Sequence, residues 1–177
     1  MSFDLILRRR IMASLIVGAL ALPAVARGAD ACQGAAPALP SELAGWKTPV
    51  PLAAAGNQDS IARATLLVGQ AASLHLLATP SVAFVHTPRE AGGAGSSGGM
   101  AGFTVSSAGT YRVALGARAW IEIVGHGTAV ESTAHQRGPA CSGVGKMVDF
   151  PLVPGRYVLE ISGGSNPVIP VLVARLK

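Results

Sequence analysis

Two stretches of the sequence, AGFTVSSAGTYRVAL (residues 101–115) and VDFPLVPGRYVLEI (residues 148–161), share one pattern. Because side chains alternate between the two faces of a strand, each copy predicts a strand, a tight turn containing Gly, and a second strand. Two copies are too few for a solenoid and suit two similar corners of a β-sandwich. The matched residues are Phe103, Val105, Gly109, Tyr111, Val113 and Leu115 in the first copy and Phe150, Leu152, Gly155, Tyr157, Leu159 and Ile161 in the second. The residues expected in the core are Tyr111, Val113, Leu115, Phe150, Tyr157, Leu159 and Ile161, together with Ile121 and Ile123 of the next strand.

Around these two copies, the chain from residue 61 onward alternates short β-prone runs with turn residues. Gly, Pro, Ser or Asn stands in most gaps, and no segment keeps a long 3.6-residue apolar period. Strands at such spacing favour a sandwich or barrel over alternating β–α units. With 50% apolar and 13% charged residues, the chain is too apolar to be disordered. We therefore predict an all-β fold, a single antiparallel, jelly-roll-like β-sandwich over residues 61–177.

The second strand of the first copy is expected to pair with the next strand along the chain, through the three-residue loop 116–118. This register sets Val113 opposite Ile121 in the core and Arg112 opposite Glu122 on the outer face. A two-residue loop would turn Glu122 into the core, where an unpaired charge is costly.

The N-terminus has the arrangement of a secretory signal. MSFDLILRRR ends in three arginines, IMASLIVGALAL follows as a short apolar run, and small residues come next. The apolar run is shorter than the roughly 20 residues that a membrane-spanning helix needs. We predict a signal peptide over residues 1–31 and a periplasmic or secreted protein. General secretion is favoured, and twin-arginine export remains the alternative.

The positive charge of the chain lies largely in this signal. Removing residues 1–28 takes away four arginines and one aspartate, so the formal net charge falls from +5 to +2. No Lys/Arg cluster remains, and nucleic-acid binding loses its main support. No further apolar stretch is long enough for a membrane span.

Residues 32–60 form a separate, irregular segment in the sequence, which we call the strap. They show no sustained period, and Pro40, Pro49 and Pro51 exclude a helix longer than a turn near residues 41–44. We expect the strap to lie on the sandwich, with Trp46 anchoring it in an apolar groove.

Cys32 and Cys141 are the only cysteines, and both outlast removal of the signal. In an oxidising compartment they predict one disulfide. The bridge would tie STAHQRGPACSG (residues 132–143), expected to be a loop without a metal, to the strap. A lipidated Cys32 is the minor alternative, because Ala29 stands where a lipoprotein signal has a larger aliphatic residue.

Among the titratable residues, His126, Glu131 and His135, with Glu122 as an alternative carboxylate, are the only set that suits a mononuclear iron site. The spacing disfavours it, because Glu122 and His126 lie roughly 13 Å apart on an extended strand. No H-x-H, H-E-x-x-H or C-x-x-C motif is present. His86 is expected to pack in a loop, and we predict no metal.

Other motifs for catalysis or phosphate binding are weak. Ser142 lies in ACSGVG, which lacks the G-x-S-x-G pattern of a hydrolase nucleophile. The glycine-rich stretch AGGAGSSGGM (residues 91–100) has no Lys-Ser/Thr after it. We interpret this stretch as a long flexible loop between strands.

Three segments carry a resemblance to known proteins: GTYRVALGARAWIEIV, STAHQRGPACSGVGKMVDFPLVPGRYVLEISG and LPSELAGWKTPVPLAAA. Together they resemble a family of short, exported bacterial β-sandwich proteins of unknown function, often labelled homogentisate dioxygenase. That label implies an enzyme with two histidines and a glutamate on iron. True homogentisate dioxygenases are cytoplasmic, cupin-like and more than twice as long, and none of their motifs aligns here. No catalytic residue is therefore carried over.

Two classes of function follow. The first is a non-catalytic accessory or binding module for a small molecule, a glycan or a protein, without a cofactor. Its candidate surface combines an outward aromatic ring with charges, which suits stacking on a sugar or peptide. That surface consists of Arg112, Arg118, Trp120 and Glu122. The alternative is a small metal-dependent oxidoreductase, a homogentisate 1,2-dioxygenase-like enzyme using iron at His126 and His135.

Overall fold

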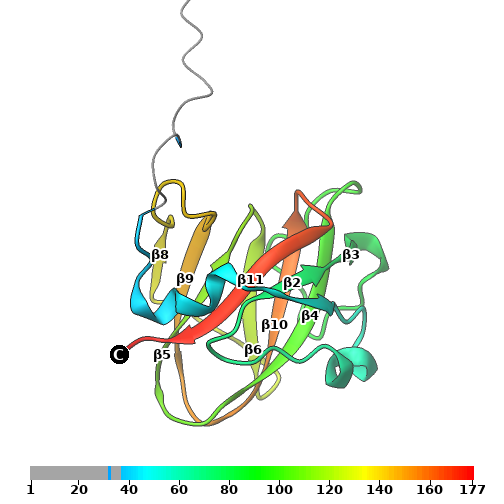
Figure 1. The fold of residues 1–177 in the computed structure, drawn as a ribbon. Coiled ribbons are helices and arrows are strands. Elements are labelled where there is room, and N and C mark those ends of the chain that lie inside the picture. The colour runs from blue at the N-terminus through cyan, green and yellow to red at the C-terminus, as the bar shows by residue number, and fades with distance from the viewer. Residues whose placement is uncertain (1–31, 33–36) are drawn as a thin grey trace, which may run out of the picture. The chain divides into compact units, whose positions relative to one another are not determined.

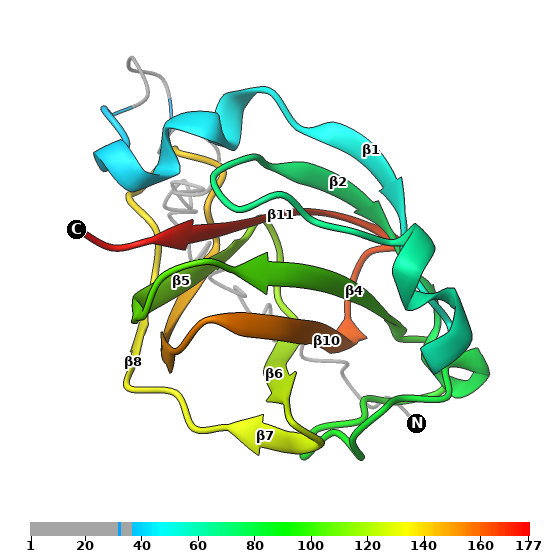
Figure 2. The ribbon, with the colours of Figure 1, turned by 90° about the horizontal axis from the view of Figure 1, so that it is seen from below.

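The fold consists of two β-sheets packed face to face, as Figures 1 and 2 show for a computed structural model that describes residues 32 and 37–177. The all-β sandwich predicted from the sequence is confirmed. The predicted signal peptide, residues 1–31, lies outside the described residues. All strand pairs are antiparallel except β1 with β2, which run parallel.

The larger sheet has six strands and the smaller has five. In spatial order, the six-stranded sheet contains β1 (Val50–Ala53), β2 (Ala72–His75), β11 (Val168–Arg175), β5 (Gly109–Leu115), β9 (Lys146–Leu152) and β8 (Ala134–Gln136). The five-stranded sheet contains β3 (Leu77–Ala78), β4 (Ser97–Val105), β10 (Gly155–Gly164), β6 (Trp120–Gly125) and β7 (Thr128–Val130). The described helices are short 3₁₀ turns, namely η1 (Ser41–Lys47), η2 (Gln58–Arg63) and η3 (Thr79–Ser81). None of them is long and apolar enough to cross a membrane.

The two similar stretches of sequence are two corners that carry the chain from one sheet to the other. Strand β4 leads into β5 of the opposite sheet, and β9 leads into β10 in the reverse direction. The hydroxyl of Tyr111 donates to the carbonyl of Ser107 at 2.9 Å, and the hydroxyl of Tyr157 donates to the carbonyl of Val153 at 2.9 Å. Each tyrosine thus closes a bond to the residue four positions before it, as in the tyrosine corner of immunoglobulin-type sandwiches.

The corners interlock across both sheets. Phe103 lies opposite Tyr157 in the pairing of β4 with β10, and Phe150 lies opposite Tyr111 in the pairing of β9 with β5. The rings of Phe103 and Tyr157 stack with their centroids 5.7 Å apart. The phenylalanine of each copy therefore lies beside the tyrosine of the other copy.

The predicted core is confirmed, because every named strand residue in it is buried. None of the nine side chains chosen from the alternation pattern exposes more than 6% of its surface. They are Tyr111, Val113, Leu115, Ile121, Ile123, Phe150, Tyr157, Leu159 and Ile161.

The predicted pairing of β5 with β6 is wrong. Strand β5 pairs with β9 and β11, whereas β6 pairs with β10 and β7 in the other sheet. Arg112 consequently lies opposite Asp149, and Glu122 lies opposite Glu160. Both strands still direct their aliphatic side chains into one core, from opposite sides. Alternation therefore identifies the buried face of a strand but not its partner.

The strap is part of the sandwich and is more regular than expected. Its residues 50–53 form β1, a parallel edge strand on β2, and η2 spans the predicted boundary at residues 60 and 61. Pro51 is tolerated because an edge strand need not donate every backbone N–H. The prediction for Trp46 is confirmed, since its ring is 7% exposed and packs with Leu43 in a second apolar cluster on the outer face of the larger sheet.

The predicted disulfide between Cys32 and Cys141 is present. Their Cα atoms are 5.3 Å apart, within the usual range for a disulfide. The segment before Cys141 is not wholly a loop, because residues 134–136 form β8 at the edge of the larger sheet.

Removing the corner hydroxyls tests the role of the two tyrosines. We expect Tyr111→Phe to lower the free energy of unfolding by about 1 kcal/mol, because one hydrogen bond is lost. Tyr157→Phe should cost more, since the backbone N–H of Val153 also bonds to that hydroxyl, at 3.2 Å. Urea unfolding of the two variants measures this. A larger loss for Tyr111→Phe, or no loss for either, would contradict the corner assignment.

Reduction of the disulfide tests how far the bridge stabilises the strap. Chain entropy sets an upper limit of roughly 4–5 kcal/mol for so long a closed loop. We expect guanidinium unfolding of the wild type to shift to lower denaturant concentration in the presence of a reductant. The double variant Cys32→Ser/Cys141→Ser is the control, and the reductant should not affect it. Two free thiols in the native protein purified without reductant would contradict the bridge.

Candidate functional site

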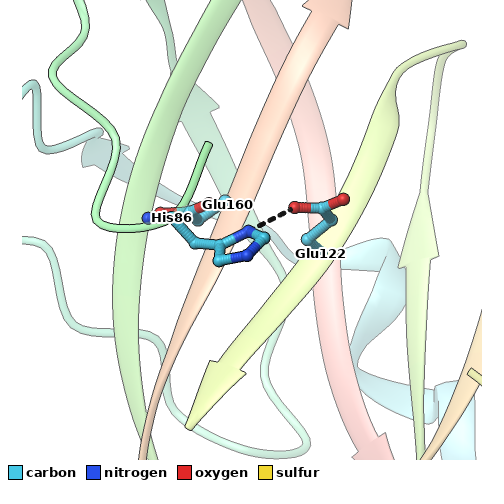
Figure 3. Close-up of side chains that lie close together, drawn as sticks. All are labelled: His86, Glu122 and Glu160. Carbon is cyan, nitrogen blue, oxygen red and sulfur yellow. Dashed lines mark hydrogen bonds and ion pairs between the residues drawn. The ribbon is translucent and has the colours of Figure 1, made fainter. Parts of the chain in front are cut away.

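Three titratable side chains, those of His86, Glu122 and Glu160, meet on the outer face of the five-stranded sheet (Figure 3). Glu122 on β6 and Glu160 on β10 are direct cross-strand partners, and His86 comes from the segment between η3 and β4. One nitrogen or oxygen atom from each lies within 4.8 Å of the others. In the described part of the chain, no other three His, Cys, Asp or Glu residues have this spacing. We call these residues the His86 cluster.

The segment 82–90 covers the two glutamates because its backbone donates to them. The N–H of His86 donates to Oε1 of Glu160 at 3.0 Å, and the N–H of Arg89 donates to Oε1 of Glu122 at 3.1 Å. The hydroxyl of Ser162 also donates to a carbonyl of this segment, that of Glu90, at 2.7 Å. Neither glutamate therefore faces solvent, although both point away from the core.

A glycine of β4, Gly98, allows this close cover. The glycine-rich stretch was expected to be a flexible loop, but its second half is strand, and Gly98 and Gly99 are buried. A Cβ atom on Gly98 would lie 3.2 Å from the ring of Phe84, which belongs to the covering segment. Gly98 is thus a position of close packing, which corrects the expectation of a loop.

Glu122 is a carboxylate surrounded by hydrogen-bond donors. Besides the backbone of Arg89, the indole N–H of Trp120 donates to its Oε1 at 3.1 Å, and Nδ1 of His86 lies 3.3 Å from its Oε2. Burial raises the pKa of Glu122, but the hydrogen bonds from Trp120, Arg89 and His86 outweigh burial and leave this pKa below its ordinary value.

Glu160 has the opposite electrostatic balance. Its side chain is 1% exposed, and its Oε2 has no hydrogen-bond partner in the described structure. Burial raises the pKa of Glu160 and the nearby charge of Glu122 adds to the rise, while backbone N–H groups of His86 and Val85 oppose it. A buried oxygen without a partner is costly, so this carboxyl group favours a proton or a cation.

A groove lies beside the cluster, around Trp120. The ammonium group of Lys146 is 5.2 Å from the centroid of the Trp120 ring and donates to the carbonyl of Ala119 at 3.0 Å. Burial lowers the pKa of Lys146. Trp120 and Lys146 line two hollows of about 310 and 440 Å³, and we call the two hollows together the Trp120 groove.

The Trp120 groove takes residues from both sheets. The polar side chains of the smaller hollow are those of Arg89, Trp120, Glu122, Glu131, Ser132, His135 and Lys146. The polar side chains of the 440 Å³ hollow are those of Glu90, Arg118, Trp120 and Lys146. Another hollow, of about 590 Å³, lies over β4 and β10, and Arg156 is the only charged residue that lines it.

Three of the four residues of the predicted binding surface lie together, and the fourth, Arg112, lies elsewhere. Arg118, Trp120 and Glu122 all line the groove, although Glu122 exposes only 6% of its surface. Arg112 lies on β5 in the other sheet. Its guanidinium makes two bonds of 2.8 Å to Asp149 and one of 3.0 Å to Glu42 of the strap. Including Arg112 in this surface was wrong, because it ties the strap to the larger sheet.

The residues of the expected iron alternative do not come together as a metal-binding group in the described chain. His126 is exposed in the turn between β6 and β7, with a positive φ of 52°. Glu131 pairs with Arg89, and His135 on β8 meets the hydroxyl of Ser132 at 2.7 Å. Strands β6 and β8 belong to different sheets, which separates the two histidines.

His86 and Glu160 were missed as partners of Glu122. The sequence carries one signal for the glutamates, since WIEIV and VLEIS each place a Glu between aliphatic residues of a strand. A carboxylate in such a position is seldom buried without a partner. The strand register, which the sequence does not show, makes the two glutamates neighbours.

Comparison of the chain with protein-family models, with curated proteins and with solved structures found no match. The resemblance described above therefore remains an expectation.

The two glutamates should respond oppositely to substitution as the pH changes. The raised pKa of Glu160 means that its contribution to stability is present below the unfolded-state pKa, near 4.5, and is lost as pH rises through the folded-state pKa. Glu160→Gln should therefore gain stability relative to the wild type between pH 4 and pH 8. The lowered pKa of Glu122 gives a contribution that is lost as pH falls, so Glu122→Gln should be least stable, relative to the wild type, at neutral pH.

Thermal unfolding of both variants and the wild type, in buffer with EDTA, measures these trends. The two variants serve as matched controls for each other, because each replaces one carboxyl group with an amide of similar shape. Parallel stability curves for all three proteins across this pH range would contradict the electrostatic assignment.

Proposed function

We propose that the protein is an exported, non-catalytic binding module that holds a small carboxylate-bearing ligand, such as a sugar acid, in the Trp120 groove. The observation that carries the proposal is the pairing of an aromatic ring with a cation that has no acidic partner. In the described chain, Lys146 has no carboxylate within 4.0 Å, although it lies over Trp120.

The chemistry of the groove suits such a ligand. The indole of Trp120 offers a flat apolar face for a sugar ring, and Lys146 and Arg118 offer donors for a carboxylate. An ammonium group that burial disfavours gains most from an anion placed beside it. The separate hollow of about 590 Å³ over β4 and β10 has no comparable pairing of an aromatic ring with an unpaired cation.

Export is supported by the disulfide between Cys32 and Cys141, because such bridges persist in oxidising compartments. The signal expected over residues 1–31 agrees with a periplasmic or secreted location.

The alternative, an iron-dependent oxidoreductase of the homogentisate 1,2-dioxygenase type, relied on His126 and His135. His126 lies in a turn of the five-stranded sheet and His135 on β8 of the six-stranded sheet, so the observed geometry favours the binding module. A protein partner would bind a broad surface with an apolar centre, whereas the hollows beside Trp120 are small and lined by polar side chains.

Tryptophan fluorescence tests the proposed ligand class. The chain has two tryptophans, so Trp46→Phe leaves Trp120 as the only reporter. We expect D-glucuronate to change the emission of this variant in a saturable way and D-glucose to have no effect at the same concentrations. The two sugars differ in a carboxylate, which the proposal requires.

Lys146→Met in the same background is the matched variant, because it keeps most of the apolar side chain over Trp120 and removes the charge. We expect it to bind glucuronate roughly tenfold more weakly, which corresponds to loss of one charge-assisted hydrogen bond. No emission change with glucuronate, or equal responses to both sugars, would overturn the proposed ligand class.

A further inference from the structure

We propose that His86, Glu122 and Glu160 bind a divalent transition-metal ion, with Zn²⁺ the best fit. This inference does not depend on the proposed function of the Trp120 groove. It rests on the separation of the ligand atoms, on an oxygen without a partner, and on how the remaining carboxylate oxygens are held.

The separation of Nδ1 of His86 and Oε2 of Glu122 fits two ligands of one metal ion as well as a long hydrogen bond. Nδ1 of His86 and Oε2 of Glu122 are 3.3 Å apart, longer than the usual value of about 2.9–3.0 Å for an N–H···O bond. Two ligands of a tetrahedral zinc, each about 2.1 Å from the ion, lie roughly 3.4 Å apart. The ligand atom of Glu160 falls within 4.8 Å of the other two, so a small rotation of its side chain would complete the set.

The Oε2 atom of Glu160 is the second observation. It is fully buried and has no hydrogen-bond partner in the described structure, while it sits next to a second carboxylate. Like charges directly opposite each other on neighbouring strands are destabilising. The guanidinium of Arg89 does not remedy this, because its Nε is 3.9 Å from Glu122 and it also pairs with Glu131. A divalent cation balances two carboxylates and a neutral imidazole.

The other oxygen of each glutamate is already held by N–H donors. Oε1 of Glu122 accepts from Trp120 and from the backbone of Arg89, and Oε1 of Glu160 accepts from the backbone of His86. Oε2 of Glu122 faces Nδ1 of His86, and Oε2 of Glu160 is left without a hydrogen-bond partner in the described structure. Donors that fix the non-coordinating oxygen are a common feature of metal sites, where they orient the carboxylate.

The ligand types select among ions. Ca²⁺ and Mg²⁺ prefer oxygen ligands alone, and an imidazole nitrogen favours zinc and its neighbours in the first transition row. Three protein ligands leave a fourth position free, and the partly exposed side chain of His86 marks the side that solvent reaches.

Calorimetric titration of the EDTA-treated mature protein with ZnCl₂, and separately with MgCl₂, tests the proposal. We expect one equivalent of Zn²⁺ to bind with a Kd of about 1 µM or tighter, and no binding of Mg²⁺ at the same concentrations. Zn²⁺ should also raise the Tm of the wild type, because it binds only the folded site.

His86→Gln and Glu160→Gln should each weaken Zn²⁺ binding at least about tenfold, whereas His75→Gln is the control. His75 is an exposed histidine on β2 of the other sheet, so its loss should leave the affinity unchanged. Glu160→Gln keeps an acceptor for the backbone of His86, so this variant still decides the question if His86→Gln does not fold.

Absence of Zn²⁺ binding by the wild type would overturn the proposal. Unchanged affinity in Glu160→Gln would overturn it too, and would indicate that zinc binds elsewhere. In either case the alternative account is that Glu160 carries a proton. The two glutamates would then serve only to hold the segment 82–90 through its backbone N–H groups. The glucuronate experiment is to be run in buffer with EDTA, so that neither result bears on it.

Discussion

The interlocked packing of two tyrosine corners determines the arrangement of the other strands. Because each corner changes sheets, and because Phe103 meets Tyr157 while Phe150 meets Tyr111, β4 must pair with β10 and β5 with β9. These two pairs form the inner part of each sheet, and the remaining strands add at their edges. Strand β6 then pairs with the other edge of β10, and this pairing brings Glu160 beside Glu122.

Which parts of the fold could be predicted depends on whether the information is local. Alternation along a strand is local, and it correctly identified the buried set that includes Leu115 and Ile123. Strand partnership is not local. The loop 116–118 is equally compatible with a hairpin and with a crossing between sheets, and the structure has the crossing. The parallel strand β1 was missed for a related reason, since its prolines argue against a central strand but not against an edge.

The site was harder to predict than the core because it depends on contacts between distant parts of the chain. Glu122 was singled out, but as an exposed charge opposite Arg112. The actual neighbour of Arg112 is Asp149, and that pairing belongs to the attachment of the strap. His86 was placed correctly in a packing loop, yet nothing in its local sequence indicates that the loop closes over two glutamates. Gly98 offered a clue, because a glycine inside a strand often marks a close approach of another segment.

Glu122 belongs to both sites, and this shared position connects them physically. Its Oε1 accepts from the indole of Trp120, which lines the groove, while its Oε2 faces His86 in the cluster. An ion held at Oε2 would restrict rotation of the carboxylate and thereby hold the acceptor that orients the indole. A proton on Glu160, which its raised pKa favours, has a similar effect. It leaves Glu122 as the charged member of the pair, and the Glu122 carboxylate can then accept the hydrogen bond from the indole of Trp120. An occupant of the buried cluster would therefore influence the geometry of the partly buried Trp120 ring through the Glu122 side chain alone.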